Sequence, residues 1–581
     1  MIRLFSLFLI HDKGIKLLLA VIIISLIVLT VLHHFMKNGH HKLWAVLCCV
    51  PLVIVLVFYA INAPGSVQSA FWLRYGMFGL AAFFIAVWGV VTYFRGSFPA
   101  YTGLVYFLTV ACSVSVFLVT MVMDTWMCVG DYSKYGWKES FSRTIDQLEA
   151  TYVTRYWKDI DFDAMREKYL PRIEKAEQEN NEEEILLALC ELTYDLYDGH
   201  VWLRYNNMDS YPDALRTVSG NDYGLSMFRD SEGEIIAVLV KPDSEAEKKG
   251  IKNGTVITAW DGESVDEAVS KVKCLDFNNI YSYIENEEIF KPAYLAGHGG
   301  ETVDVSFLDD DGKEKTVTLG KISGHNPELN DVIAAVCNNN HCIGDNLYTC
   351  MLDDDTGYLR VQNENFEKLE SLHFVVSELS FRNDEVYNMM KDKIQALEDQ
   401  GMKKMVIDIR NNNGGYGLIS QTIASLFADV EMTPETGYFK GKKFASFKKP
   451  RKVGEALWSD IPVAVLVNAK TCSAGDVLAH YLSKGDNTVL IGNTYPWGCS
   501  QGTGGRCFLT DDKVELWYPV CPTLDENNEP IAEARSDRKA VTKLDYQVTY
   551  SREEVIELFD DPDRDKVLET ALEYLHSVDR Q

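Results

Sequence analysis

The fold of the largest part of the chain depends on Ile461-Pro-Val-Ala-Val-Leu-Val467, Ala469-Lys-Thr-Cys-Ser-Ala-Gly-Asp476 and Val477-Leu-Ala-His-Tyr-Leu482. The first segment is an apolar run that predicts a buried strand, and the third is typical of the start of a helix. Between them, Ser473 would hold its hydroxyl out of the sheet, next to the unpaired first N–H groups of the helix. Such a turn can supply a nucleophile and part of an oxyanion hole. The alternative is that Ser473 is a simple helix N-cap.

Two further motifs lie on either side of this turn. Upstream, Met405-Val-Ile-Asp-Ile409 predicts a second buried strand, which runs into the glycine-rich turn Arg410-Asn-Asn-Asn-Gly-Gly-Tyr-Gly417. Downstream lies Val489-Leu-Ile-Gly-Asn-Thr-Tyr-Pro-Trp-Gly-Cys-Ser-Gln-Gly502. An alternating strand at Gly357–Val361 and a helical segment at Asp384–Gln400 precede the second strand. Strands that alternate with helices in this way predict an α/β domain.

In this order, the three motifs resemble those of the S41 serine peptidases, the C-terminal processing (tail-specific) proteases and their tricorn-like relatives. Three ordered motifs are more specific than one, and the resemblance covers roughly the last three quarters of the chain. It implies an α/β catalytic domain of the crotonase/ClpP-like type over residues 330–560. Residues 561–581 are expected to form a C-terminal helix.

The resemblance also implies an acyl-transfer site. Ser473 is then the nucleophile, and the N–H of Ala474 with that of Gly414 or Gly415 forms the oxyanion hole. Glycine at the latter positions lets the backbone approach a substrate closely. Asp476 stands where relatives carry Glu, and it is expected to support the site from the same helix.

The general base is implied by a departure from part of the family. Many processing proteases use a Lys after the serine, but Thr494-Tyr-Pro-Trp-Gly-Cys499 contains none, and Lys484 belongs to another element. Tricorn-like members instead carry an Asp-Gly-His turn before a PDZ-like domain, and Asp198-Gly-His200 matches it. His200 is therefore the implied base, because imidazole titrates near neutrality. Without the resemblance, His200 would be interpreted as a polar residue at a strand edge.

A base-orienting acid is expected in Asn527-Asn-Glu-Pro-Ile-Ala-Glu533, where tricorn-like relatives place a Glu. Glu533 is the first choice and Glu529 the second; the alternative is that Glu533 is a solvated surface acid. The neighbouring Thr542-Lys-Leu-Asp545 departs from the family's Gly-x-x-Pro-Asp.

Two regions precede the catalytic part. Residues 136–210 predict a helical subdomain, because apolar residues recur at helical spacing. Residues 220–322 resemble a PDZ module, in which Tyr223-Gly-Leu-Ser-Met227 corresponds to the carboxylate-binding loop. Gly224 and Leu225 are then expected to bind the C-terminal region of a peptide. The alternative is a packing domain with an empty or blocked groove, and residues 275–296 form an unassigned insertion.

Residues 1–126 are different in composition. Long apolar runs at Leu17–Val31, Leu43–Ile61, Gly76–Tyr93 and Leu104–Met123 predict about four transmembrane helices. A cleaved signal peptide before a soluble core is the alternative. Basic residues on both sides of the first span leave its orientation open. The family resemblance implies a multi-pass protein of the cell membrane with an extracytoplasmic catalytic domain.

Charge and cysteine content limit the partners. The net charge is −28, although seven Lys or Arg and only two acids precede residue 127. The strongly negative charge of the chain from residue 127 onward argues against nucleic acid as a partner. The absence of Cys-x-x-Cys and His-Glu-x-x-His gives no reason to expect a metal or other cofactor. The thirteen cysteines could form disulfides or be separate buried thiols, and two sets are close in sequence: Cys337, Cys342 and Cys350, and Cys499 and Cys507.

Together these features predict an all-α membrane region, a helical subdomain, a β-rich PDZ-like domain and an α/β catalytic domain. The expected function is that of a membrane-anchored serine endopeptidase, which hydrolyses protein or peptide substrates captured through their C-terminal region. The alternatives are a catalytically impaired S41-like binding protein and a membrane sensor. The oligomeric state does not follow from the sequence.

Overall fold

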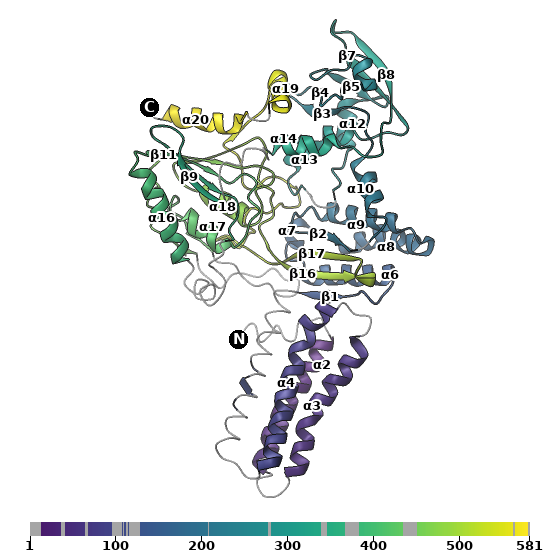
Figure 1. Ribbon diagram of the computed structural model, residues 1–581, viewed down its shortest axis with the longest axis vertical. Helices are drawn as coiled ribbons and strands as arrows, with labels where there is room; N and C mark the ends of the chain where they lie inside the picture. The colour runs from purple at the N-terminus through teal and green to yellow at the C-terminus, as the bar shows by residue number, and fades with distance from the viewer. Residues whose placement is uncertain are drawn as a thin grey trace.

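The computed structural model in Figure 1 places a helical bundle at one end of the molecule and a larger α/β body at the other. It describes residues 13–35, 41–63, 68–95, 128–206, 208–276, 281–337, 346–365, 383–433, 450–561 and 564–578, with single positions 107, 110, 111 and 114.

The N-terminal bundle consists of three apolar helices that lie side by side (Figure 1). They are α2 Lys13–Phe35, α3 His41–Asn62 and α4 Gln68–Arg95. Each contains a stretch long and apolar enough to cross a membrane, with mean hydropathy of 3.0, 2.7 and 2.0 respectively. Nearly all of the fourth expected span, Leu104–Met123, lies outside the described residues.

Packing within the bundle leaves a wide apolar outer surface. Helices α3 and α4 approach closely at Gly89, where a Cβ would lie 2.4 Å from that of Cys48. On the outside, Ile24 and Phe94 are 59% and 77% exposed. So large an unpartnered apolar surface suits a lipid environment better than water.

Four helices lie in the stretch expected to be a helical subdomain: α6 Trp137–Thr151, α7 Arg155–Lys158, α8 Phe162–Glu179 and α9 Glu182–Leu196. Phe141, Ile145 and Leu148 bury one face of α6 at helical spacing. Asp161 caps α8, because its carboxylate accepts the N–H groups of the first turn. The Asp-Gly-His turn comes directly after α9.

The next part contains the region that resembles a PDZ module. Its elements are α10 Tyr211–Ser219, β3 Ser226–Arg229, β4 Ile235–Val238, α11 Glu245–Lys248, β5 Ile257–Trp260, β6 Glu263–Ser264, α12 Val265–Lys271, α13 Ile284–Leu295, β7 Thr302–Leu308, β8 Glu314–Gly320 and α14 Glu328–Val336. Antiparallel β3 and β4 pair, and the other strands form a sheet in the order β6-β5-β7-β8. The unassigned insertion is largely α13, which packs against β3.

A six-stranded sheet forms the centre of the catalytic part, in the order β18-β15-β14-β11-β10-β9. All neighbouring strands are parallel except β9, which is antiparallel to β10. The strands are β9 Leu347–Met351, β10 Thr356–Val361, β11 Lys404–Asp408, β14 Val463–Leu466, β15 Thr488–Gly492 and β18 Tyr546–Gln547. The helices around them are α16 Asp384–Glu398, α17 Gly417–Ala424, α18 Ala474–Leu482, α19 Arg552–Asp560 and α20 Lys566–Val578.

Both faces of this sheet are covered. Val463 and Val465 of β14 pack with the helices α16 to α18, whereas Ala464 and Leu466 share a core with α20. Burial on both faces explains why these strands are continuous apolar runs rather than alternating ones. The strands expected at 461–467 and 405–409 and the helix after Ser473 are confirmed as β14, β11 and α18.

A second sheet, in the order β1-β16-β17-β2, joins two strands before the PDZ-like region to two strands of the catalytic part. Its strands are β1 Val129–Asp131, β2 Trp202–Tyr205, β16 Gly502–Leu509 and β17 Val514–Cys521. Strand β17 pairs with β2, with Trp517 opposite Trp202. This pairing brings the Asp-Gly-His turn, which precedes β2, to the segment that precedes β16.

The remaining elements are the short strands β12 Glu431–Met432 and β13 Arg451–Lys452 and the 3-10 helix η3 Thr510–Asp512. Among the described residues, the eleven cysteines form no disulfide, so Cys499 is not bonded to Cys507, nor Cys337 to Cys350. Cys342 lies outside the described residues.

Candidate active site

Ser473 occupies a sharp turn between β14 and α18. Its φ of 59° and ψ of −119° are unfavourable for a residue with a side chain. A strained strand-to-helix turn of this kind is how a nucleophilic serine is presented in other hydrolases. The Ser473 N–H donates to the Asp476 carboxylate at 3.0 Å and to the Cys499 carbonyl at 3.1 Å. The turn is therefore fixed through its backbone.

The expected oxyanion donors lie around this turn. A Cβ on Gly414 would be 2.4 Å from the Ser473 Cβ and 3.0 Å from the Ala474 nitrogen, so only glycine fits there. The Gly414 N–H, however, donates to Asn412 Oδ1 at 2.7 Å. Within the described part of the chain, no hydrogen bond uses the N–H of Ala474 or Gly415. This geometry favours Gly415 over Gly414 as the second donor.

Asp476 links the serine turn to the chain that follows β15. Its buried carboxylate accepts the N–H of Gly498 at 3.0 Å and of Cys499 at 3.2 Å, in addition to that of Ser473. Burial raises the pKa of Asp476 to about 7, although these N–H groups oppose the shift. These contacts tie the Ser473 turn to the backbone at Gly498 and Cys499.

His200 lies in a buried turn and is 8% exposed. The backbone N–H of His200 donates to Asp198 Oδ1 at 2.9 Å, and the backbone N–H of Gly199 donates to Ser282 Oγ at 3.0 Å. Burial lowers the pKa of His200, whereas the Asp198 carboxylate and the backbone of Gln501 oppose the shift. The ring's Nδ1 is buried without a hydrogen-bond partner.

Residues 497–501, which we call the 497–501 segment, contact every part of the expected triad. Cys499 binds the Ser473 turn, and Ser500 donates its N–H to Glu533 Oε2 at 3.2 Å. A Cβ on Gly199 would lie 2.4 Å from Trp497 Nε1, so the turn that carries His200 packs closely on the same segment. The sheet pairing thus brings Ser473, His200 and Glu533 around one short stretch of backbone.

The triad is not joined by direct hydrogen bonds. Across the described ranges, none connects the Ser473 hydroxyl with the His200 ring, or that ring with Glu533. Glu533 is fully buried, so it is not a solvated surface acid. Burial raises its pKa to about 8, although the nearby Lys158 ammonium opposes this. The second choice, Glu529, instead accepts Trp157 Nε1 at 3.0 Å and pairs with Arg535.

Lys158 and Tyr152 are members of the site that sequence reasoning missed. Lys158 Nζ lies 2.8 Å from Glu533 Oε1 and 3.5 Å from Asp198 Oδ2. The Tyr152 hydroxyl donates to the same Asp198 oxygen at 2.6 Å. No motif marks these two residues, because both belong to ordinary amphipathic helical sequence. Their role appears only when the helical subdomain docks on the catalytic part.

The expected peptide-binding residues lie before β3. The Gly224 N–H donates to Asp222 Oδ1 at 2.8 Å, and Asp222 also pairs with Lys241 at 2.6 Å. Leu225 is 1% exposed. The Asp222 carboxylate therefore accepts the Gly224 N–H, which the carboxylate of a bound peptide would otherwise accept.

An α/β sheet that presents a strained serine at the mouth of a helix is the arrangement expected of a serine hydrolase. Residues 355–535 match the model of Peptidase family S41.

Two relatives of the chain are named as carboxy-terminal processing proteases. The chain is 25% identical over 281 residues to the carboxy-terminal processing protease CtpA of Bacillus subtilis, covering 48% of this chain and 47% of that protein. It is 26% identical over 353 residues to a carboxyl-terminal-processing protease of Picosynechococcus sp., covering 59% and 69%. The chain thus spans about half the length of the first relative and somewhat more of the second. The crystal structure of mature CPAF aligns with a TM-score of 0.46 and 12% identity over 76% of this chain and 96% of that one.

Proposed function

We propose that this protein is a membrane-anchored serine endopeptidase that hydrolyses peptide bonds in protein substrates. The observation that carries the proposal is the 497–501 segment, which contacts the strained Ser473 turn, the Asp-Gly-His turn and Glu533. The S41 domain and the processing-protease relatives support the same reaction class.

In the proposed reaction, Ser473 Oγ attacks the peptide carbonyl while His200 takes its proton. The N–H groups of Ala474 and Gly415 stabilise the oxyanion, and each such donor is typically worth ~3–4 kcal/mol. His200 then returns the proton to the leaving amine, and a water molecule, activated in the same way, releases the acyl group. Catalytic hydrogen bonds are often long before substrate binds, so the missing Ser473–His200 contact is compatible with this scheme.

The test is cleavage of fluorescently labelled casein by the full chain in detergent. Ser473→Ala and His200→Ala should each reduce kcat by at least about a thousandfold. Ser483→Ala at the other end of α18, where the hydroxyl only binds the His480 carbonyl, is the matched control and should cleave normally. Equal cleavage by wild type and Ser473→Ala would contradict the proposal.

A catalytically impaired binding protein is the second candidate. The unpartnered Nδ1 of His200 favours it, because a working base is normally oriented by a hydrogen bond to that atom. It predicts that the folded wild-type protein shows no turnover of casein under any condition of pH.

We also propose that α2, α3 and α4 anchor the protein in the cell membrane with the α/β body outside the cytoplasm. The three apolar helices support anchoring, and the family resemblance supports the orientation. Capture of substrate C-termini at Gly224 and Leu225 is a further part of the proposal, and it requires a peptide carboxylate to displace Asp222.

A further inference from the structure

Lys158 is a lysine whose side chain is completely buried. A buried ammonium is costly unless anions and hydrogen bonds replace its water. Here Nζ lies 2.8 Å from Glu533 Oε1 and 3.5 Å from Asp198 Oδ2, and it donates a hydrogen bond to the Tyr197 carbonyl oxygen at 2.9 Å. Although burial disfavours its charge, the two carboxylates raise the pKa of Lys158 above its usual value. Lys158 therefore stays charged and is not a candidate base.

The three charged residues of this contact, Lys158, Asp198 and Glu533, come from distant parts of the chain. Lys158 ends the short helix α7, Asp198 begins the turn that carries His200, and Glu533 follows β17. Around this contact, the Ser536 N–H donates to the Trp157 carbonyl at 3.1 Å. The ammonium is thus the point at which the helical subdomain, the base turn and the acid segment meet.

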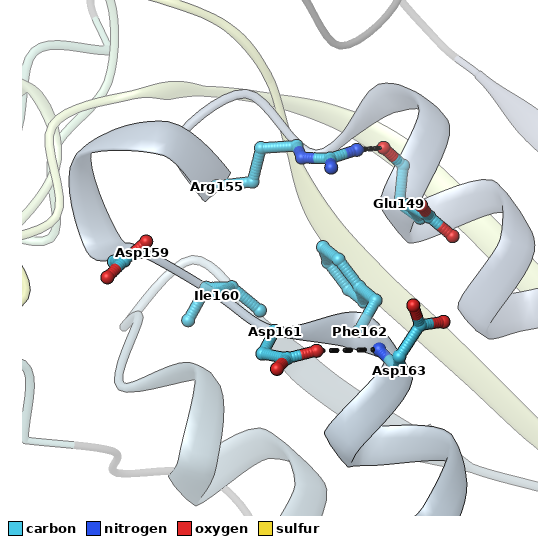
Figure 2. A pocket seen from close by; sticks show the side chains of 7 residues that line it. All are labelled: Glu149, Arg155, Asp159, Ile160, Asp161, Phe162 and Asp163. Carbon is cyan, nitrogen blue, oxygen red and sulfur yellow. Dashed lines mark hydrogen bonds between the residues drawn. The ribbon is translucent and has the colours of Figure 1, made fainter.

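The backbone that carries Lys158 is held from its outer side. Figure 2 shows Arg155 reaching the Glu149 carbonyl and Asp161 bound to the N–H of Asp163, one contact before and one after the α7 turn. The pocket drawn there contains none of the expected catalytic residues. The Arg155 contact ties the start of α7, the helix that carries Lys158, to α6, and the Asp161 contact caps α8, which follows.

We propose that Lys158 is a positioning residue of the active site, whose ammonium ties Asp198 to Glu533 and so holds the turn of His200 against the 497–501 segment. The proposal rests on the function proposed above and adds a residue to that site. Lys158 acts through the two carboxylates and does not touch substrate.

The charges explain why this tie matters for the base. Two buried carboxylates face one ammonium, with the Tyr152 hydroxyl on Asp198; other charged or titratable groups nearby are Tyr197, Asp476 and Arg538. Although burial opposes ionisation, Lys158 and His200 lower the pKa of Asp198. The Lys158 cation also disfavours protonation of His200. Burial is the main cause of the lowered pKa of His200, and the Lys158 cation adds to it, so both favour a neutral imidazole that can accept the serine proton.

Removal of the cation should have two separable effects. The turn of His200 loses its tie, which should lower kcat by about tenfold to a hundredfold with little change in KM. The proton affinity of the remaining cluster rises, so the acid limb of kcat/KM should move to higher pH. A purely structural role for Lys158 would lower the amount of folded enzyme without moving that limb.

The test measures kcat, KM and the pH profile of casein cleavage by the full chain. Lys158→Met paired with Glu533→Gln leaves no unpaired glutamate in the core, and this double variant is compared with Glu533→Gln alone, so that the difference between the two reports the loss of the cation. Lys158→Arg keeps the cation and should keep the wild-type acid limb. Lys168→Met is the matched control: this exposed lysine of α8 pairs with Asp195 at 2.6 Å, and its loss should change neither quantity.

The expected result is that the double variant has a lower kcat and an acid limb at higher pH than Glu533→Gln alone, whereas Lys158→Arg keeps the wild-type acid limb and Lys168→Met keeps the wild-type kcat and acid limb. A double variant with the melting temperature, kcat and acid limb of Glu533→Gln alone would overturn the role of Lys158 while leaving Ser473-dependent cleavage intact. Cleavage that persists in Ser473→Ala would instead overturn the proposed function, and the role of Lys158 with it.

Discussion

The backbone of Ser473 is the point of strain in the site. A left-handed conformation of this kind costs on the order of 1–3 kcal/mol in a residue with a side chain. The Ser473 N–H contacts to Asp476 and Cys499 hold it in place. The protein thus gives up stability at the residue that we propose as its nucleophile.

Substitution of Ser473 by glycine should relieve this strain. The free energy of unfolding of Ser473→Gly should exceed that of Ser473→Ala by about 1 kcal/mol. Glycine adopts a positive φ without strain, and its greater conformational entropy in the unfolded chain cancels only part of this gain. Both variants lack the hydroxyl, so their difference isolates the backbone term. Thermal unfolding of the two proteins measures it, and a less stable Ser473→Gly would contradict a strained turn.

Some residues of the candidate site could be predicted from the sequence and others could not. Ser473, Ala474 and the glycines at 414 and 415 could be predicted, because their motifs are local and their order matches a family. Lys158 could not, because its partners Asp198 and Glu533 are far apart in sequence and only docking makes them neighbours. The burial of Glu533 was also beyond sequence reasoning, which left a solvated acid as an open alternative.

At the scale of elements, β14 and α18 formed where hydrophobic periodicity predicted them, and so did β11 and α16. Periodicity succeeds there because both faces of the central sheet are buried. Hydrophobic periodicity did not predict α13, the main part of the insertion at residues 275–296. This helix packs against β3, and its residue Asn286 forms hydrogen bonds with the backbone of Tyr495. A helix that packs between two regions has no repeat or motif to reveal its partners.

The loop before β3 gives a prediction about substrate capture. Asp222→Ala should free the Gly224 N–H and leave Lys241 without this anionic partner, so a peptide's C-terminal carboxylate should bind more easily. We expect KM for peptides with a free C-terminus to fall about threefold to tenfold, as for a net gain of ~1 kcal/mol. The same peptides with an amidated C-terminus are the control. An equal change for both forms would show that the loop does not read a carboxylate.

At the scale of the whole molecule, the apolar bundle stands at one end and the α/β body at the other (Figure 1). Strand β1 contacts α4 of the apolar bundle and pairs with β16, so the bundle lies against the sheet that contains β2 and β17. Three candidate spans are described, and the fourth expected span lies mainly outside the described residues.

The orientation of the body can be measured in intact cells with a membrane-impermeant amine-reactive reagent. Lys175 and Lys313, whose side chains are 74% and 77% exposed, should be modified before lysis if the body is extracytoplasmic. Buried Lys158 serves as the internal control and should remain unmodified while the protein is folded. Modification of the two exposed lysines only after lysis would place the body in the cytoplasm.

The central claim is that His200, carried across the intervening module, activates Ser473. The most direct measurement is covalent labelling of the full-length protein with a fluorophosphonate probe, with the labelled residue located by mass spectrometry. The account predicts modification of Ser473 in the wild type and a large loss of labelling rate in a folded His200→Ala variant. Labelling of Ser473 at the same rate in that variant, or none in the wild type, would contradict it.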